Sequence, residues 1–250
     1  MLSNDQQRRY ARHIVLPQLG EAGQETLLRS SVLVIGAGGL GSSAIAYLAA
    51  SGVGRIGVVE PDRVELSNLQ RQVLYEQDDI GRPKVQAVAD RISEVNSECK
   101  LETYEERFTT ENAAKRVAQY DLVVDGSDNF ATRFAVSDAC RHAKKPLVSA
   151  AMSGFAAQLT TFKPYLGEEH PCYRCLVPGV PSLETDCRQE GIIGPLAGMI
   201  GSMQALEAVK ELIGIGESLS GWLLLIDGLR PDMRFVQLVR NPGCESCSSV

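Results

Sequence analysis

Short apolar runs alternate with stretches of helical periodicity over the first 150 residues of the chain. Runs that are rich in β-branched residues and bounded by turn residues predict strands, and the periods of about 3.6 residues between them predict helices. Strands that alternate with helices form βαβ units, so the pattern predicts an α/β fold with a Rossmann-like, mostly parallel sheet and flanking helices. The expected strands are 31–36, 55–60, 100–104, 121–125 and 146–150.

The segments on either side follow other patterns. Residues 3–29 have the pattern of polar, amphipathic helix. Segment 164–193 is rich in Pro, Gly and charged residues and shows little periodicity, and so long a loop is uncommon in a compact domain and often functional. The remaining expected elements are a strand at 158–163, a helix at 195–213, and strands at 222–226 and 235–239.

The composition fits one globular domain, because 250 residues with 44% hydrophobic residues can bury a full core. A net charge of −6, with acids and bases interspersed, argues against general binding to nucleic acid or to anionic membranes. The apolar stretch 192–213 is interrupted by charged residues, which indicates an amphipathic helix and no membrane span. The first residues lack the pattern of a secretory signal, so we expect a cytoplasmic protein.

The sequence VIGAGGLG follows the first expected strand and fits the pattern G-x-G-x-x-G. Gly36 permits a tight turn out of the strand, Gly38 (followed by Gly39) lets backbone approach a phosphate, and Gly41 allows close packing of helix on strand. Glu60 ends the second strand, where an acid suits the ribose hydroxyls of either NAD or ATP. The alternative is a glycine-rich turn that binds nothing.

A dense set of polar and charged residues follows Glu60 and includes Asp62 and Asn68. One interpretation is a ligand site just beyond a strand end, and another is a loop in which Ser67 or Asn68 caps a short helix. Lys84 lies at an expected helix start, where a cation opposes the helix dipole. A bound phosphate would explain that position.

Asp128 and Asn129 follow the strand expected at 121–125, and ligands of open α/β sheets bind beyond the carboxyl ends of strands. Asp128 either caps the next helix or holds Mg²⁺, a hard cation that takes carboxylates together with substrate phosphates. The glycine loop lacks the G-K-[ST] ending of a P-loop, so the lysine and the metal-binding group that a triphosphate needs must come from elsewhere. Arg71, Lys84 and Asp128 have the right chemistry.

Two C-x-x-C pairs, Cys172 with Cys175 and Cys244 with Cys247, lie far apart in the chain. Four thiolates with no open position form a structural Zn²⁺ site, so we expect zinc to tie the C-terminal end to the middle of the fold. A redox role for either pair is the alternative.

The other three of the seven cysteines lie outside these pairs. Cys99 and Cys140 fall in strand and helix patterns and are expected to pack in the interior. Cys187 lies in the long loop beside Arg188, where an exposed thiol can be reactive. A cysteine without any role in a mobile loop is the alternative.

These motifs resemble the ThiF/MoeB-type (HesA/MoeB/ThiF) adenylyltransferases, relatives of the ubiquitin-activating enzymes. Several independent motifs in family order are more specific than one glycine loop. His13 departs from the family pattern, which has glutamine after Tyr-x-Arg. The match runs nearly end to end through RRYARH (8–13), GAGGLG (36–41), SNLQRQ (67–72), GRPK (81–84), Asp128-Asn129 with Arg133, and both cysteine pairs.

The resemblance implies one adenylyltransferase domain over 1–250, with N-terminal helices at 1–30, a nucleotide-binding core at 31–150, and a carrier-binding, zinc-stapled part at 151–250. It implies a homodimer that transfers AMP from ATP to the C-terminal Gly-Gly carboxylate of a small ubiquitin-like sulfur carrier, ThiS-like or MoaD-like. Pyrophosphate would leave, and a separate donor protein would supply sulfur for thiamine or molybdopterin biosynthesis.

The resemblance also implies roles for residues. Glu60 would bind ribose, Asn68, Arg71 and Lys84 would bind phosphates, and Asp128 would bind Mg²⁺. Arg12 would reach into the partner subunit's site, and Cys187 matches a cysteine that thiamine-branch members link to their carrier. The implied nucleotide site comprises Gly36, Gly38, Gly39, Gly41, Glu60, Asp62, Asn68, Arg71, Lys84, Asp128 and Asn129.

Two other functions remain open from the residues themselves. An NAD-dependent oxidoreductase would need a substrate domain with a hydride-transfer acid or base, whereas 150–250 offers cysteine pairs and a long loop. A non-catalytic scaffold that binds zinc and nucleotide would show affinity for ATP without turnover.

Overall fold

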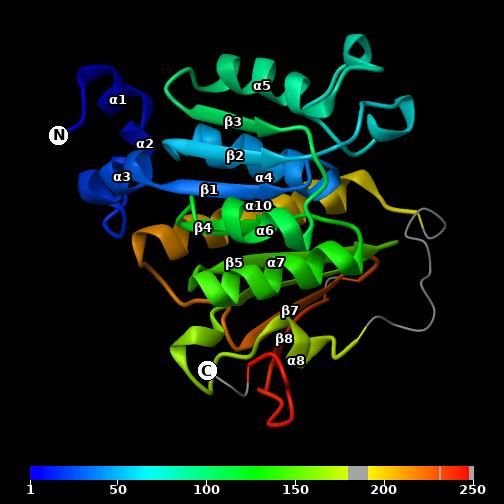
Figure 1. Ribbon diagram of the computed structural model, residues 1–250. Helices are drawn as coiled ribbons and strands as arrows, with labels where there is room; N and C mark the ends of the chain where they lie inside the picture. The colour runs from blue at the N-terminus through cyan, green and yellow to red at the C-terminus, as the bar shows by residue number, and fades with distance from the viewer. Residues whose placement is uncertain (180–190, 231, 248–250) are drawn as a thin grey trace.

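The computed structural model of the chain describes residues 1–179, 191–230 and 232–247 (Figure 1). Its strands are β1 (Ser31–Ile35), β2 (Arg55–Val59), β3 (Lys100–Tyr104), β4 (Leu122–Asp125), β5 (Leu147–Ser153), β6 (Ala156–Phe162), β7 (Trp222–Asp227) and β8 (Asp232–Gln237). Its α-helices are α1 (Asn4–Arg9), α2 (Ala11–Ile14), α3 (Gly20–Arg29), α4 (Gly39–Ala50), α5 (Lys84–Val95), α6 (Thr110–Val117), α7 (Phe130–Ala143), α8 (Tyr173–Leu176) and α10 (Gly194–Ile213). Short 3-10 helices are η1 (Leu66–Asn68), η2 (Gln77–Asp79) and η3 (Pro164–Leu166).

The eight strands found in the described residues form one sheet in the order β3-β2-β1-β4-β5-β6-β7-β8. The pairs from β3 to β5 are parallel, whereas β5 to β8 pair antiparallel. The chain moves from β1 to β2 and β3 on one side and then returns to place β4 on the other side of β1. The carboxyl ends of β1 and β4 therefore form a topological switch point, where open α/β sheets bind ligands.

Alternate residues of the central strands enter two separate hydrophobic cores. Val32 and Val34 of β1 pack on the side of α4, α5 and α10, whereas Leu33 and Ile35 face the side of α6 and α7. Figure 1 shows α6 and α7 in front of the sheet and α4 and α10 behind it. This burial on both faces is why the strands appear in the sequence as continuous apolar runs.

The predicted class is confirmed, and the differences lie at element boundaries. The N-terminal segment, expected to be helical, forms the three helices α1 to α3. Strand β8 begins three residues before the expected start at 235, because pairing with β7 fixes its start and that information is not local. The segment expected as a loop at 164–193 contains η3 and α8 within its described part. Among the described residues, no helix has both the length and the apolar character needed to cross a membrane.

Candidate active site

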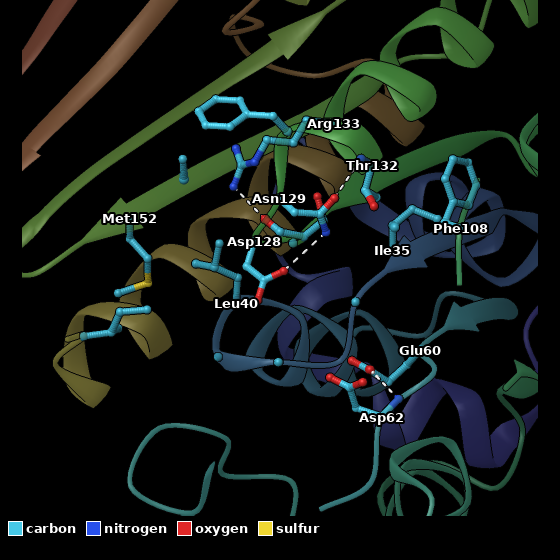
Figure 2. Close-up of a pocket in the computed structure, with 18 of the residues that line it drawn as sticks. Ile35, Leu40, Glu60, Asp62, Phe108, Asp128, Asn129, Thr132, Arg133 and Met152 are labelled. Atoms are coloured by element: carbon cyan, nitrogen blue, oxygen red, sulfur yellow. Dashed lines mark hydrogen bonds between the residues drawn. The ribbon is translucent and has the colours of Figure 1, made fainter. Parts of the chain in front are cut away.

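A cavity of about 1160 Å³ lies at the carboxyl ends of β1, β2 and β4 (Figure 2). Its size suits a nucleotide with part of a second substrate. It brings together most residues of the predicted nucleotide site, which come from separate loops: Gly36, Gly38, Gly39, Glu60, Asp62, Asn68, Arg71, Lys84, Asp128 and Asn129.

The glycine loop has a geometry that only small residues allow. Gly36 has a φ of +87°, in the left-handed region, and a Cβ there would meet Gly126 O at 3.1 Å. A Cβ on Gly41 would lie only 1.9 Å from Gly36 O, so a side chain at this position is excluded. Gly38 precedes α4, and a Cβ there would lie 3.8 Å from its nearest neighbour, Gln72 Nε2. Gly41 is thus a packing glycine, whereas Gly38 faces open space in the cavity.

Alanine at these two glycines is expected to have opposite consequences. Gly41→Ala should destabilise the fold by about 2 kcal/mol or more, because the new methyl group overlaps the backbone carbonyl of Gly36. Gly38→Ala should keep its melting temperature within about 2 °C, yet weaken ATP binding about tenfold by occupying the space over the loop. Thermal melts and calorimetric ATP titrations check both, and equal melting temperatures for the two variants would contradict the assignment.

Glu60 holds the glycine loop in place. Its two carboxylate oxygens accept hydrogen bonds from Ala37 N, at 2.8 Å, and from Asp62 N, at 2.9 Å. The Tyr75 hydroxyl donates to Ala37 O at 2.8 Å, and burial raises the pKa of that phenol, so it stays protonated. A carboxylate accepts more than two hydrogen bonds, so Glu60 retains capacity for a ribose hydroxyl. No sequence pattern indicates the role of Tyr75.

Lys84 is a buried cation at the cavity wall. It opens α5 after Pro83, and its side chain is 6% exposed. Lys84 Nζ lies 4.0 Å from Glu60 Oε2 and 3.8 Å from Asp62 Oδ2. These two carboxylates give the lysine a reason for its place at a helix N-terminus even before a phosphate binds.

Arg71 and Asn68 come from the segment around η1. Arg71 lines the cavity, and its Nη1 donates to Ser67 O at 3.0 Å. Asn68 is buried, and its Oδ1 accepts from Glu65 N at 3.1 Å. Glu65 is the N-cap of η1, and the Asn68 side chain completes its capping box, so Asn68 does help to cap a short helix, from position N3.

The turn after β4 places Asp128 at the cavity. Asn129 is the N-cap of α7 and accepts from Thr132 N at 2.9 Å, so the alternative that Asp128 caps this helix is wrong. Asp128 is exposed, and its Oδ1 accepts from Asn129 Nδ2 at 3.4 Å. Arg133 is buried and braces the turn, with Nη2 donating to Ser127 O at 2.6 Å (Figure 2).

Two buried polar atoms of the cavity wall lack a hydrogen-bond partner among the described residues, Gln72 Oε1 and Ser127 Oγ. An unpaired buried polar atom is costly, and a bound ligand or water would offset that cost. The donor set of the cavity fits Mg²⁺ with a nucleotide phosphate, since it combines a solvent-facing carboxylate, Asp128, with Arg71 and Lys84.

Arg12 lies away from this cavity. It is an exposed residue of α2, and the α1 to α3 helices sit at the end of the parallel strands opposite the cavity (Figure 1). Arg12 is not part of the cavity wall of its own chain. Cys187, also predicted from sequence, lies outside the described residues.

The four paired cysteines converge, as their spacing predicted. The Sγ atoms lie 3.8 Å apart for Cys172 and Cys175, 3.7 Å for Cys172 and Cys244, and 3.4 Å for Cys175 and Cys247. Four sulfurs around one Zn²⁺ at about 2.3 Å stand about 3.8 Å apart, so the cluster fits a tetrahedral zinc site. These separations are far longer than a disulfide bond, which is about 2.05 Å.

Cys99 and Cys140 are buried packing residues, as predicted. Burial raises the pKa of Cys99 to about 11 and raises that of Cys140 further above its ordinary value. Both thiols therefore stay protonated and unreactive at neutral pH.

The ThiF family model matches residues 10–246 of this chain. A relative named sulfur carrier protein adenylyltransferase, from Thermus thermophilus, is 49% identical over 96% of this chain and 90% of its own length. Another, adenylyltransferase and sulfurtransferase MOCS3 from Culex quinquefasciatus, is 44% identical over 99% of this chain. This chain spans 56% of that longer protein.

Solved structures show the same fold. The crystal structure of Escherichia coli MccB with MccA-N7isoASN superimposes with a TM-score of 0.83 at 22% identity, covering 98% of this chain and 75% of that one. A structure of PaaA gives a TM-score of 0.80 at 22% identity, over 96% and 76% of the two chains. With the glycine loop, the charged cavity and the cysteine cluster in place, these matches establish that the chain belongs to the ThiF family.

Proposed function

We propose that this chain adenylylates the C-terminal Gly-Gly carboxylate of a small ubiquitin-like sulfur carrier, using ATP and releasing pyrophosphate. One observation carries the proposal: a single cavity joins the glycine loop to Arg71, Lys84 and Asp128. The proposal is further supported by the 49% identity of this chain to a relative named sulfur carrier protein adenylyltransferase. The product would serve thiamine or molybdopterin biosynthesis in the cytoplasm, with sulfur supplied by a separate donor protein.

The cavity residues bind different parts of the nucleotide according to their charge. Phosphates lie against backbone N–H groups where α4 begins beside Gly38, with Lys84 and Arg71 as cationic partners. Glu60 binds the ribose hydroxyls while it holds Ala37 N. Asp128 holds Mg²⁺, which neutralises phosphate charge when it is bound.

The reaction requires no general base. The attacking carboxylate of the carrier is already ionised at neutral pH. The barrier comes from bringing one anion onto another and from the charge on departing pyrophosphate, and preorganised cations lower both. This explains a cavity wall with charged side chains and without a nucleophile paired to a histidine among its described residues.

A second copy of the chain completes the site in this proposal. Arg12 is exposed on α2, at the opposite end of the sheet from its own cavity. A homodimer that places the N-terminal helices of one chain over the cavity of the other would supply Arg12 as an additional phosphate contact.

The carrier docks on the antiparallel part of the sheet in this proposal. The hairpin of β7 and β8 exposes Leu229 (72%), Met233 (57%) and Phe235 (60%). Strand β8 is an edge strand with exposed residues along nearly all its length, and the cavity extends to β6 and β7 through Gln158 and Leu225. An apolar surface beside a cavity suits a protein whose C-terminal tail must enter that cavity.

Phe235→Ala is expected to raise the KM for the carrier about tenfold and to leave the KM for ATP unchanged, because Phe235 lies outside the cavity wall. Ile80→Ala, which truncates an exposed side chain elsewhere, should change neither constant. Steady-state kinetics with each substrate varied check this prediction. A rise in the KM for ATP alone would contradict carrier docking at the hairpin.

Exchange of labelled pyrophosphate into ATP tests the function itself. We expect exchange that depends on a carrier with a Gly-Gly C-terminus and disappears when the last glycine is removed. ATP binding without exchange with any ThiS-like or MoaD-like carrier would favour a scaffold. Tight NADH binding without ATP binding would favour an oxidoreductase.

A further inference from the structure

The short helix α8 joins the cysteine cluster to the cavity. Cys172 is the N-cap of α8 and Cys175 lies within it, both as members of the four-thiol cluster, and between them stand Tyr173 and Arg174. Tyr173 lines the cavity, whereas Arg174 binds the side of α7. Successive residues of one helical turn thus face a metal site, a substrate cavity and a helix.

Arg174 fixes α8 to α7. Its Nε and Nη2 donate to the two oxygens of Asp138 at 3.1 and 2.6 Å, and its guanidinium lies 4.5 Å above the ring of Phe134. Ser246, from the second C-x-x-C segment, donates its hydroxyl to the same Asp138 at 3.1 Å. One carboxylate of α7 therefore holds both halves of the cysteine cluster, and Figure 1 shows the C-terminal segment lying beside α8.

Tyr173 of α8 packs against α7 and against β6 of the sheet. It is 3% exposed, and its ring makes edge contacts with Phe134 of α7 at 5.3 Å and Phe162 of β6 at 5.9 Å. Burial raises the pKa of the phenol, whereas the charge of Arg133 and a hydrogen bond with it lower that pKa. Both residues line the cavity, and the ring of Tyr173 contacts Phe134, which follows Arg133 in α7.

Arg133 binds the turn that contains the predicted magnesium ligand, Asp128. Its Nη2 donates to Ser127 O at 2.6 Å, and Asp128 is the next residue (Figure 2). The guanidinium is buried, so it holds that carbonyl with little competition from water. A continuous series of contacts runs from the cysteine cluster through Tyr173 and Arg133 to Asp128.

We propose that Tyr173 is a positioning residue through which the four-cysteine centre orients the Asp128 turn, so that an intact centre sets the affinity of the nucleotide site for Mg²⁺. This inference rests on the proposed adenylylation site. The cysteine centre then has two effects, since it stabilises the fold and also tunes a cation site in a different part of the chain.

Tyr173→Phe tests the link, because it keeps the ring and its packing and removes only the hydroxyl. We expect one zinc per chain and an unchanged melting temperature, with the Mg²⁺ concentration for half-maximal binding of a non-hydrolysable ATP analogue raised about three- to tenfold. Tyr165→Phe, which removes a hydroxyl outside the cavity wall, should leave the Mg²⁺ dependence unchanged. An unchanged Mg²⁺ dependence in Tyr173→Phe, with zinc retained, would overturn the proposal.

Asp138→Asn provides a second test, since it loosens α8 from α7 without touching the cavity wall. The same rise in the Mg²⁺ requirement supports the proposal, and a lower melting temperature without that rise counts against it. Binding of the analogue is measured without a carrier. A wild-type protein that shows Mg²⁺-dependent binding but no exchange would therefore refute the carrier function and leave this inference intact.

Discussion

Asp128→Ala is expected to lower the rate of pyrophosphate exchange into ATP by at least about 100-fold, because the cavity loses the carboxylate assigned to Mg²⁺. The fold should remain intact. Asp128 is exposed, and the N-cap of α7 is the neighbouring Asn129. We expect the melting temperature to stay within about 2 °C of wild type, since such surface changes alter stability by only about 0.5 kcal/mol.

Two further variants separate the role of this carboxylate from general charge effects. Asp78→Ala removes an exposed carboxylate outside the cavity wall and should retain full exchange activity. Arg71→Ala should also lose activity about 100-fold or more, because it removes a cation from the phosphate site. Full activity in both Asp128→Ala and Arg71→Ala would refute the assignment of this cavity as the active site.

Cys244→Ser is expected to lower the zinc content well below one per chain and to destabilise the protein by about 4 kcal/mol, or roughly 10 °C in melting temperature. The physical reason is chain entropy. The cluster ties Cys172 and Cys175 to Cys244 and Cys247 and so closes a long loop that includes α10, β7 and β8. A cross-link of that span restricts the unfolded chain, as a disulfide does.

Metal analysis of freshly purified protein, together with thermal melts, measures the effect. Cys99→Ala serves as the control, because Cys99 is a buried thiol outside the cluster. The Cys99→Ala variant should have a lower melting temperature, because packing is lost, and an unchanged zinc content. Wild-type protein that contains far less than one zinc per chain would show that the metal does not contribute to stability.

Local pattern determined the strands with little error. β1 and β2 are short, mostly apolar runs followed by Gly36 and Glu60, and each lies within one residue of its expected range. These strands are buried on both faces, so almost every residue in them must be apolar, and that requirement is visible without any partner. β8 was placed less accurately, because its exposed side chains carry no such requirement and its start depends on pairing with β7.

The sequence predicts those parts of the candidate site whose residues form a pattern that is rare in other proteins. Two C-x-x-C pairs in one chain are typical of a four-thiolate metal site, and their sulfurs meet in the structure. Glu60 was expected as a ribose ligand, but its hydrogen bond to Ala37 N was not. Tyr75 and Tyr173 gave no signal, because a tyrosine in a loop or a short helix resembles any packing residue until its neighbours are known.

The sequence by itself determined the α/β class, the glycine loop, the cysteine cluster and the types of charged groups that a nucleotide needs. Each of these follows from residues that lie close together in the chain or that have few chemical alternatives. Only the tertiary structure decided the strand order that brings β1 beside β4, the burial of Lys84 against Glu60, and the contacts from Tyr173 through Arg133 to Ser127. These depend on pairings between distant segments, whose free energy comes from packing the whole domain and leaves no local pattern.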